Sequence, residues 1–145
     1  MKLTRKSEYG LRGILYLAKQ SERRAILTSE VSNRQNIPQS FLNKIFQKLV
    51  RAGVLRSYRG YRGGFSLAKK PSEITLRSII ETLEGPIDFW PDVENSESEL
   101  SGTGQSVALT SAWDKIQRKI NRMLDRVTVM DLLKKSDRLN KKERD

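Results

Sequence analysis

Cysteine and histidine are both absent from this chain of 145 residues. Without thiolates or imidazoles, the chain lacks the ligands of structural zinc, of a histidine-bound haem and of a thiolate-bound iron–sulfur cluster, and it can form no disulfide. The residues that most often act as catalytic nucleophile and general base are missing too. Because no nucleophile–base pair or phosphate-cradling motif is visible either, we expect no catalytic residues, no metal site and no enzyme.

Long apolar segments are also lacking. No apolar run approaches the roughly 18 residues that a membrane-spanning helix requires, and Met1 is followed by charged residues rather than by the apolar core of a signal peptide. We therefore expect a soluble, cytoplasmic chain with no membrane partner. Its length suits one domain of ordinary size, or a small domain with an appendage.

The chain does have an excess of positive charge, which is concentrated in one half. Its 28 Lys and Arg residues outnumber its 17 Asp and Glu residues and give a net charge of +11. Residues 1–70 carry 16 basic and 3 acidic side chains, whereas residues 71–106 carry 1 basic and 8 acidic. A basic half followed by an acidic stretch favours a module that binds a polyanion. The acidic stretch beside it would be repelled by that polyanion and is not expected to contact it.

Three amphipathic helices are predicted in the first half of the chain. Apolar residues recur at helical spacing in residues 8–19, in a short segment that Thr28 is expected to cap, and after Pro38. Gly10 and Gly13 each cost the first helix about 1 kcal/mol relative to Ala, so we expect it to pack closely against another helix. Two short helices separated by a tight break, as in the second and third segments, predict a helix-turn-helix.

A hairpin and a further helix are predicted next. Gly53 closes the third helix in a left-handed cap. The β-prone residues 54–58 and 65–68 then flank a basic, Gly-rich turn. A hairpin directly after a helix-turn-helix is a wing, and residues 74–83 follow it as another short helix. Residues 1–85 are thus expected to form a winged helix-turn-helix domain, in a fold that is mainly α with a small β-wing.

The composition changes at residue 86. Residues 86–106 are acidic, rich in Ser and Gly and without apolar periodicity, which predicts a loop longer than compact domains usually carry. In residues 107–133 apolar side chains recur every three or four positions, which predicts a helix about 30 Å long and a last turn. Residues 134–145 contain one apolar residue in twelve and are expected to be a basic, disordered tail.

Candidate DNA contacts lie on the third helix and the wing. A recognition helix places polar side chains of its N-terminal end against base edges in the major groove. At the narrow wing we expect Arg59 to enter the minor groove and Arg62 to contact a phosphate. Phosphate contacts that position the protein without reading sequence are expected at Lys2, Arg5 and Lys6. The candidates for base contacts are Gln39, Ser40, Asn43 and Lys44.

The apolar stripe of residues 107–133 has too little in its own chain to pack against. We expect it to pair with its copy in a second subunit, which would place two wings and two recognition helices on one palindrome. The residues of this predicted dimer interface are Leu109, Trp113, Ile116, Ile120, Met123, Leu124 and Val127.

Several segments together carry a family resemblance, although none is specific alone. They are residues 1–12, 37–49, 51–67 and 80–86 (MKLTRKSEYGLR, IPQSFLNKIFQKL, RAGVLRSYRGYRGGFSL and IETLEGP), together with Trp113. Over residues 1–133 the chain resembles the IscR, NsrR and CymR family of bacterial winged-helix regulators, also called the Rrf2 family. The resemblance implies a homodimeric transcription factor with a long crossed dimerisation helix. It also implies DNA contacts at Gln39, Ser40, Asn43 and Arg59.

The chain departs from that family in one respect. Sensory members hold an iron–sulfur cluster on three cysteines in the loop before the Trp of the long helix, and this loop has serines instead: Ser96, Ser98, Ser101 and Ser106. The chain is therefore either a natural cluster-free member, like CymR, or the apo form of a sensor whose cysteines have been replaced by serine. Glu8 aligns with an acidic residue that ligates the cluster in some members, but without thiolates we expect a surface carboxylate. No cofactor is expected in this sequence.

The function predicted from these features is transcriptional regulation. We expect a homodimer that binds double-stranded DNA at a palindromic, partly A·T-rich operator and represses transcription. The alternative is a cluster-free regulator that acts mainly through a protein partner, with the loop and the long helix as its docking surface. An RNA-binding module is a third interpretation, but Tyr58, Tyr61 and Phe65 are too few for a base-stacking surface.

Overall fold

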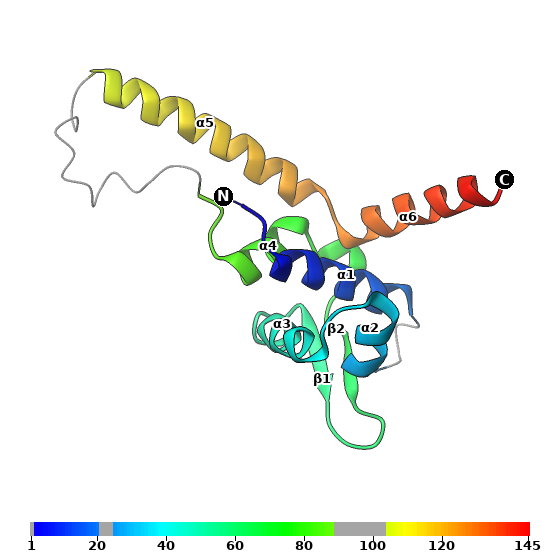
Figure 1. The fold of residues 1–145 in the computed structure, drawn as a ribbon. Helices are drawn as coiled ribbons and strands as arrows, with labels where there is room; N and C mark the ends of the chain where they lie inside the picture. Colours follow the sequence, from blue (N-terminus) through cyan, green and yellow to red (C-terminus); the bar gives the residue numbers. More distant parts are fainter. Residues whose placement is uncertain (1, 21–24, 89–103) are drawn as a thin grey trace.

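The computed structural model describes residues 2–20, 25–88 and 104–145, and within these ranges six α-helices accompany one two-stranded hairpin. The fold class predicted from the sequence, mainly α with a small β-wing, is confirmed. Helices α5 and α6 run along one side of the body, and the hairpin projects from the opposite side (Figure 1). The elements are α1 (Arg5–Lys19), α2 (Thr28–Gln35), α3 (Gln39–Arg51), β1 (Leu55–Tyr58), β2 (Gly64–Leu67), the short helix η1 (Pro71–Glu73), α4 (Leu76–Glu84), α5 (Gly104–Arg126) and α6 (Val129–Arg144).

The predicted helix-turn-helix is formed by α2 and α3. The prediction that Thr28 caps α2 is wrong, because Thr28 is the first residue of the helix and its N-cap is Leu27, whose side chain forms no capping hydrogen bond. Asn36 ends α2 in the left-handed conformation, with φ of 53°, which Asn adopts more readily than most residues. Pro38 immediately precedes α3, where the missing N–H of proline leaves no helical hydrogen bond unmade. At the far end of α3, Gly53 has φ of 76°, in agreement with the predicted left-handed cap.

Helix α1 lies in the middle of the body and approaches its neighbours at two glycines. A β-carbon on Gly13 would lie 2.7 Å from Cε1 of Phe46 in α3. One on Gly10 would collide with the side chain of Leu83 in α4. Phe46 and Leu83 both belong to the buried core. The sequence prediction that these glycines mark a close helix–helix contact is therefore confirmed.

The start of α1 is tied to the end of α4 through one carboxylate. Oε1 of Glu84 accepts hydrogen bonds from the amide of Thr4 at 3.1 Å and from Oγ of the fully buried Ser7 at 2.8 Å, and the Thr4 hydroxyl donates to it as well. These bonds, that of the Thr4 hydroxyl first, hold the pKa of Glu84 below its ordinary value. Lys6 donates from Nζ to the carbonyl of Leu83 at 3.3 Å. Five residues thus join two helix ends that lie far apart in sequence.

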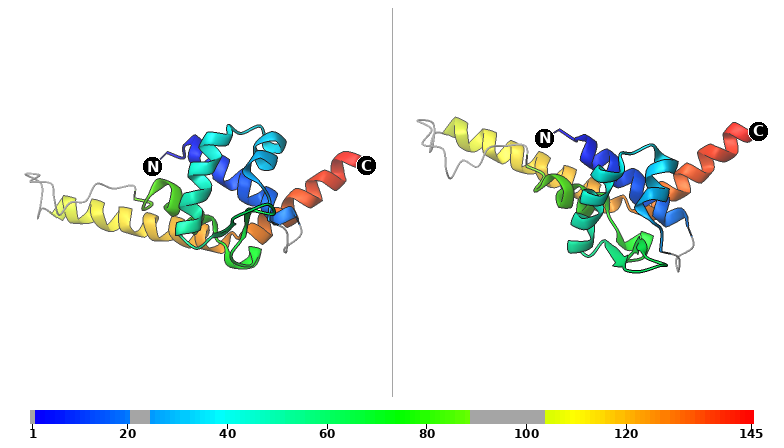
Figure 2. Two further views of the ribbon diagram at one scale, coloured as in Figure 1. Left: turned by 90° about the horizontal axis from the view of Figure 1, so that it is seen from below. Right: turned by 60° about the horizontal axis from the view of Figure 1, so that its bottom comes forward.

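A second junction fixes α5 and α6 to the same body. Thr75 and Thr128, the N-caps of α4 and α6, form an isolated antiparallel bridge. On either side of it, the amide of Leu76 donates to the carbonyl of Val127 at 2.8 Å and that of Val129 to the carbonyl of Ile74 at 2.9 Å. From here α5 extends far beyond the body, as two further views show (Figure 2). No helix in the described ranges combines the length and the apolarity of a membrane span.

The prediction of a disordered tail over residues 134–145 is wrong, because α6 continues to Arg144. Thr128 and Asp131 form a reciprocal capping box that starts the helix, and Val129 and Leu133 are buried against the body. Once a first turn is anchored, later turns add hydrogen bonds at little further cost. The basic residues of the last turn also face the negative end of the helix dipole. Helix α5 begins at Gly104, three residues before the predicted boundary.

The glycine contact predicts a steric effect. Gly13→Ala should destabilise the fold by about 1–3 kcal/mol, because the added methyl group overlaps the buried ring of Phe46 and forces the packed core to shift. The measurement is the free energy of unfolding in urea. Gly104→Ala is the matched control: apart from its chain neighbours and the backbone of its own helix, none of the described residues lies within 4 Å of its added β-carbon, so stability should stay equal or rise slightly. Equal stability of the Gly13→Ala variant would contradict the close contact.

The Glu84 junction predicts a pH dependence. Because the pKa of Glu84 is lowered in the folded state, its stabilisation is present above the unfolded-state pKa and is lost as pH falls through the folded-state pKa. Glu84→Gln should therefore cost about 1 kcal/mol at pH 7, and the difference from the wild type should close at strongly acidic pH. Urea unfolding at several pH values measures it. The control is Glu143→Gln, on the exposed end of α6, whose free energy of unfolding should stay within about 0.5 kcal/mol of the wild type. A destabilisation by Glu84→Gln that does not change with pH would refute the account.

Candidate nucleic-acid interface

Helix α3 separates an apolar inner face from a polar outer face. Its buried residues are Leu42, Ile45, Phe46 and Leu49, which recur at the spacing of one helical stripe. The four predicted base-contacting residues all lie on the exposed side, as do three further polar residues along the same helix. The exposed set is Gln39, Ser40, Asn43, Lys44, Gln47, Lys48 and Arg51.

Phe46 fixes the orientation of α3 in the body. Its side chain is fully buried, and its ring packs edge-on against Phe65 of β2, with the centroids 5.2 Å apart. At the start of α3, Phe41 makes a second edge-on contact with Tyr9 of α1 at 6.2 Å. The same aromatic contacts therefore hold α3 relative to both α1 and the hairpin.

The hairpin presents its basic residues at an exposed tip. In its antiparallel register Leu55 pairs with Leu67, and Tyr58 pairs with Gly64. Gly60 has φ of 95°, and its carbonyl accepts the amide of Gly63 at 2.9 Å to close the turn. Glycine is needed here because other residues rarely adopt a positive φ.

A third backbone segment braces the hairpin. Ile26 and Phe65 exchange two backbone hydrogen bonds of 2.9 and 2.8 Å. A β-carbon on Gly64 would lie 2.5 Å from the backbone of Ile26, so glycine permits this approach. On the outer strand the pKa of Tyr58 is lowered, first by the hydroxyl of Ser66 that donates to it and then by Arg56.

The predicted wing residues Arg59 and Arg62 are both exposed at this tip. The side chain of Tyr61 between them is fully exposed to solvent. A narrow projection that carries two guanidinium groups is suited to the negative potential of a DNA groove. The structure thus places the predicted wing contacts where they are free to meet a nucleic acid.

The charge of this part of the chain has one sign. Between Glu30 and Glu73 there is no acidic residue. This interval includes the end of α2, all of α3 and the whole hairpin, so a polyanion approaching these elements meets no carboxylate from them. The basic residues of the interval are Arg34, Lys44, Lys48, Arg51, Arg56, Arg59, Arg62, Lys69 and Lys70.

Lys48 and Arg51 are candidate phosphate contacts that the sequence prediction omitted. They continue along the exposed side of α3 from Lys44, at spacings of four and then three residues, and residues so spaced share one helix face. The three-and-four-residue spacing of these basic residues is the sequence signal that marks them.

The three predicted phosphate contacts near the N-terminus differ in their surroundings. Lys2 is exposed. Arg5 lies 3.8 Å from the carboxylate of Glu8, which also pairs with Arg12 at 3.4 Å. The ammonium of Lys6 is directed to the carbonyl of Leu83 at the end of α4. Of the three, Lys2 therefore has its charge least engaged within the described part of the chain.

Helix α5 buries none of its residues completely. Within the predicted dimer interface, Leu109, Ile116 and Met123 are exposed by 54%, 43% and 67%. The other members of the stripe are half-buried, and they are Trp113, Ile120, Leu124 and Val127. An ion pair of 2.9 Å between Arg77 of α4 and Asp125 fixes the base of the helix. The outer part of the apolar stripe thus has no cover from the described residues of its own chain.

Comparison with known proteins gives a consistent result. The family model for Rrf2, described as an iron-dependent transcriptional regulator, matches residues 3–135. A protein of Synechocystis proposed to be an HTH-type transcriptional regulator is 34% identical over 132 residues, which are 91% of this chain and 87% of that protein. The HTH-type transcriptional regulator CymR of Bacillus subtilis is 30% identical over 137 residues, which are 94% of this chain and 93% of CymR.

Solved structures of regulators from the same family are similar to this chain in fold. The structure of CymR, the global cysteine regulator of B. subtilis, aligns with a TM-score of 0.75 and 29% identity and covers 92% of this chain and 97% of that one. The structure of IscR from T. potens aligns with a TM-score of 0.70 and 27% identity and covers 94% and 88% of the two chains. These alignments cover nearly the whole of each chain, so the similarity includes the long helix as well as the winged domain.

Proposed function

The chain belongs to the Rrf2 family of winged-helix transcriptional regulators and is a DNA-binding regulator, and from that premise we propose that it acts as a homodimer on a palindromic, partly A·T-rich operator. The observation that carries the proposal is the acid-free surface formed by α3 and the hairpin. Polar side chains on α3 suit the major groove, and the arginine-bearing tip suits the minor groove. We propose repression as the outcome, through an operator that overlaps the site where polymerase binds.

The proposed dimer is supported by the exposed apolar side of α5. Its exposed apolar side chains form a stripe along a helix that extends beyond the body, and a contiguous apolar surface of this kind usually marks an interface. A second copy presents an identical stripe, so a two-fold contact can bury both. The alternative, action through a protein partner, would use this same uncovered stripe. The mass of the pure protein distinguishes the two.

The residues of this chain do not fit an iron–sulfur cluster, although the family description refers to iron. The sequence contains no thiolate or imidazole donor, and the carboxylate of Glu8 is shared between Arg5 and Arg12. Ser106 lies in the first turn of α5, whereas Ser96, Ser98 and Ser101 lie outside the described residues. The proposed function therefore uses no cluster, and it places a non-enzymatic regulator in the cytoplasm with the DNA that it binds.

The wing predicts a specific loss of DNA affinity. Arg59→Ala should weaken binding by about 1–3 kcal/mol, with the loss of discrimination concentrated at A·T-rich minor-groove positions. Fluorescence anisotropy on DNA selected from a random pool by the wild type measures this loss. Arg138→Ala removes the same charge from an exposed position on α6 and should bind as the wild type does. Unchanged binding by Arg59→Ala would remove the wing from the interface.

The dimer interface predicts a change of mass. Sedimentation of the wild type should give twice the single-chain mass of 16.7 kDa. Ile116→Asp combined with Met123→Asp should give the single-chain mass with a folded body, because both side chains are exposed within one chain and a charge buried between two copies is strongly unfavourable. Arg118→Asp, also exposed on α5, should remain a dimer. A dimer that survives the double substitution would show that α5 is not the interface.

A further inference from the structure

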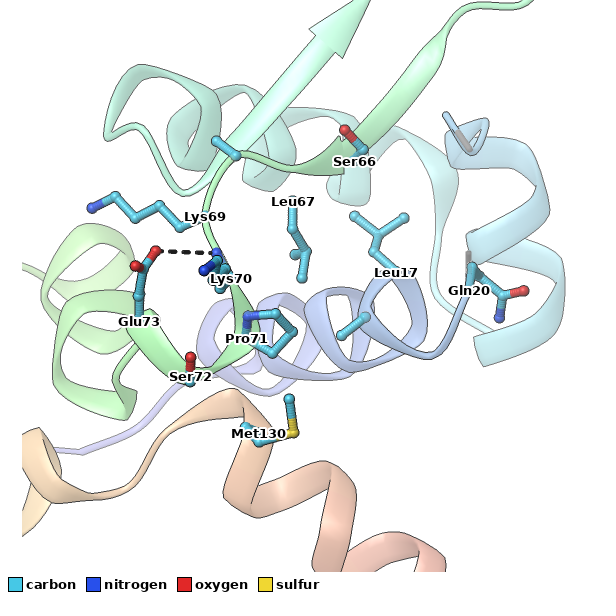
Figure 3. Close-up of a pocket in the computed structure, with 12 residues that line it drawn as sticks. Leu17, Gln20, Ser66, Leu67, Lys69, Lys70, Pro71, Ser72, Glu73 and Met130 are labelled. Carbon is cyan, nitrogen blue, oxygen red and sulfur yellow. Dashed lines mark hydrogen bonds between the residues drawn. The ribbon is translucent and has the colours of Figure 1, made fainter. Parts of the chain in front are cut away.

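A cavity of about 510 Å³ lies where the wing strand meets the base of α6. This volume falls within the roughly 300–1,000 Å³ that small-molecule sites occupy. Leu17, Leu67, Pro71 and Met130 surround the same space and come from four different elements: α1, β2, η1 and α6 (Figure 3). We call it the β2–α6 cavity.

The lining of the β2–α6 cavity combines an apolar part with the polar side chains of Gln20, Ser66 and Ser72 and with charged residues at one end. The side chain of Leu17 is almost entirely buried beneath it, and those of Leu67 and Met130 are partly exposed. Lys69 and Lys70 stand at one end beside Glu73. Two ammonium groups and one carboxylate leave the lining with a net charge of +1.

The lysine charges are not neutralised within the described part of the chain. The carboxylate of Glu73 accepts the backbone amide of Lys70 at 3.3 Å, and neither lysine forms an ion pair with any described residue. A ligand with one negative charge suits this end, since the Glu73 carboxylate would repel a second. A hydrocarbon part suits the apolar floor, where burying it removes it from water.

The position of the β2–α6 cavity couples two parts of the proposed function. Leu67 ends the strand that carries the wing, and Met130 lies in the first turn of α6, two residues after the Thr75–Thr128 bridge at the base of α5. A molecule in contact with both would change DNA affinity if it fits one arrangement of wing and α5 better than another.

We propose that the β2–α6 cavity binds a small organic monocarboxylate with an apolar chain, and that its occupancy alters the affinity for DNA. The regulatory half of this proposal rests on the proposed function. The binding half rests on the cavity and its lining alone.

Methyl NMR of the full chain tests the binding half directly. The sequence has three methionines, Met1, Met123 and Met130, so 13C-methyl labelling gives a spectrum that Met130→Leu assigns. Titration with sodium octanoate should shift the Met130 signal saturably and leave that of Met123, on α5, unchanged. Octan-1-ol, which lacks the charge, should bind more weakly. A Met130 signal that does not move, or moves together with that of Met123, would overturn the proposal.

Charge substitutions test the lysines. Lys69→Gln combined with Lys70→Gln should weaken octanoate binding about five-fold, the effect of a partly exposed charge pair. Lys134→Gln combined with Lys135→Gln removes the same charge from exposed positions of α6 outside the cavity and should leave octanoate binding unchanged. Equal losses in the two double variants would show a general electrostatic effect and overturn the site.

DNA binding with and without octanoate tests the regulatory half. Octanoate should change the operator affinity of the wild type several-fold, and it should have a smaller effect on the Lys69→Gln, Lys70→Gln variant at the same concentration. The readout is the ratio of operator affinities with and without octanoate in each protein, because Lys69 and Lys70 belong to the basic interval between Glu30 and Glu73 and removing two positive charges lowers DNA affinity by itself. An equal ratio in the wild type and the variant would overturn the regulatory half of the proposal. Failure of the wild type to bind any DNA would overturn the proposed function. A saturable Met130 shift would then still support the binding site.

Discussion

An apolar stripe along α5 stands away from the body of its own chain, and Leu109, Ile116 and Met123 expose about half of their surface or more. Water contact with such a stripe is unfavourable in proportion to its area. Folding of the single chain does not remove this cost, because within the described residues the inner side of α5 alone is covered. A second copy of the chain can cover the outer side of α5. The resulting dimer carries two DNA-binding surfaces.

The link between that stripe and the DNA surface consists of a few close contacts. The bridge between Thr75 and Thr128 joins α5 and α6 to the start of α4. The end of α4 holds the start of α1 through Glu84, and α1 in turn lies against α3 at Gly13. A change at any of these contacts alters how the surface formed by α3 and the hairpin is held relative to its copy, even though none of them touches DNA in the proposal.

Much of this arrangement follows from the sequence, because it depends on local patterns. The apolar spacing of α3, the basic Gly-rich turn and the two glycines of α1 predict the helix-turn-helix, the wing and the close packing. Contacts between distant residues leave no such pattern. Nothing local pairs Ser7 with Glu84, or turns Lys6 from a candidate phosphate contact toward the carbonyl of Leu83. Residues 134–145 were mispredicted because a scarcity of apolar residues indicates exposure, and an exposed segment can still be helical when its first turn is anchored.

Hydroxyl-radical footprinting of the full chain on DNA selected from a random pool tests the central claim most directly. The account predicts two protected patches related by two-fold symmetry, with centres about 10 base pairs or a whole multiple of that distance apart. Each half should include a protected minor-groove segment for the wing. A single asymmetric patch, or protection without a minor-groove component, would contradict the claim that α5 pairs two identical surfaces on one operator.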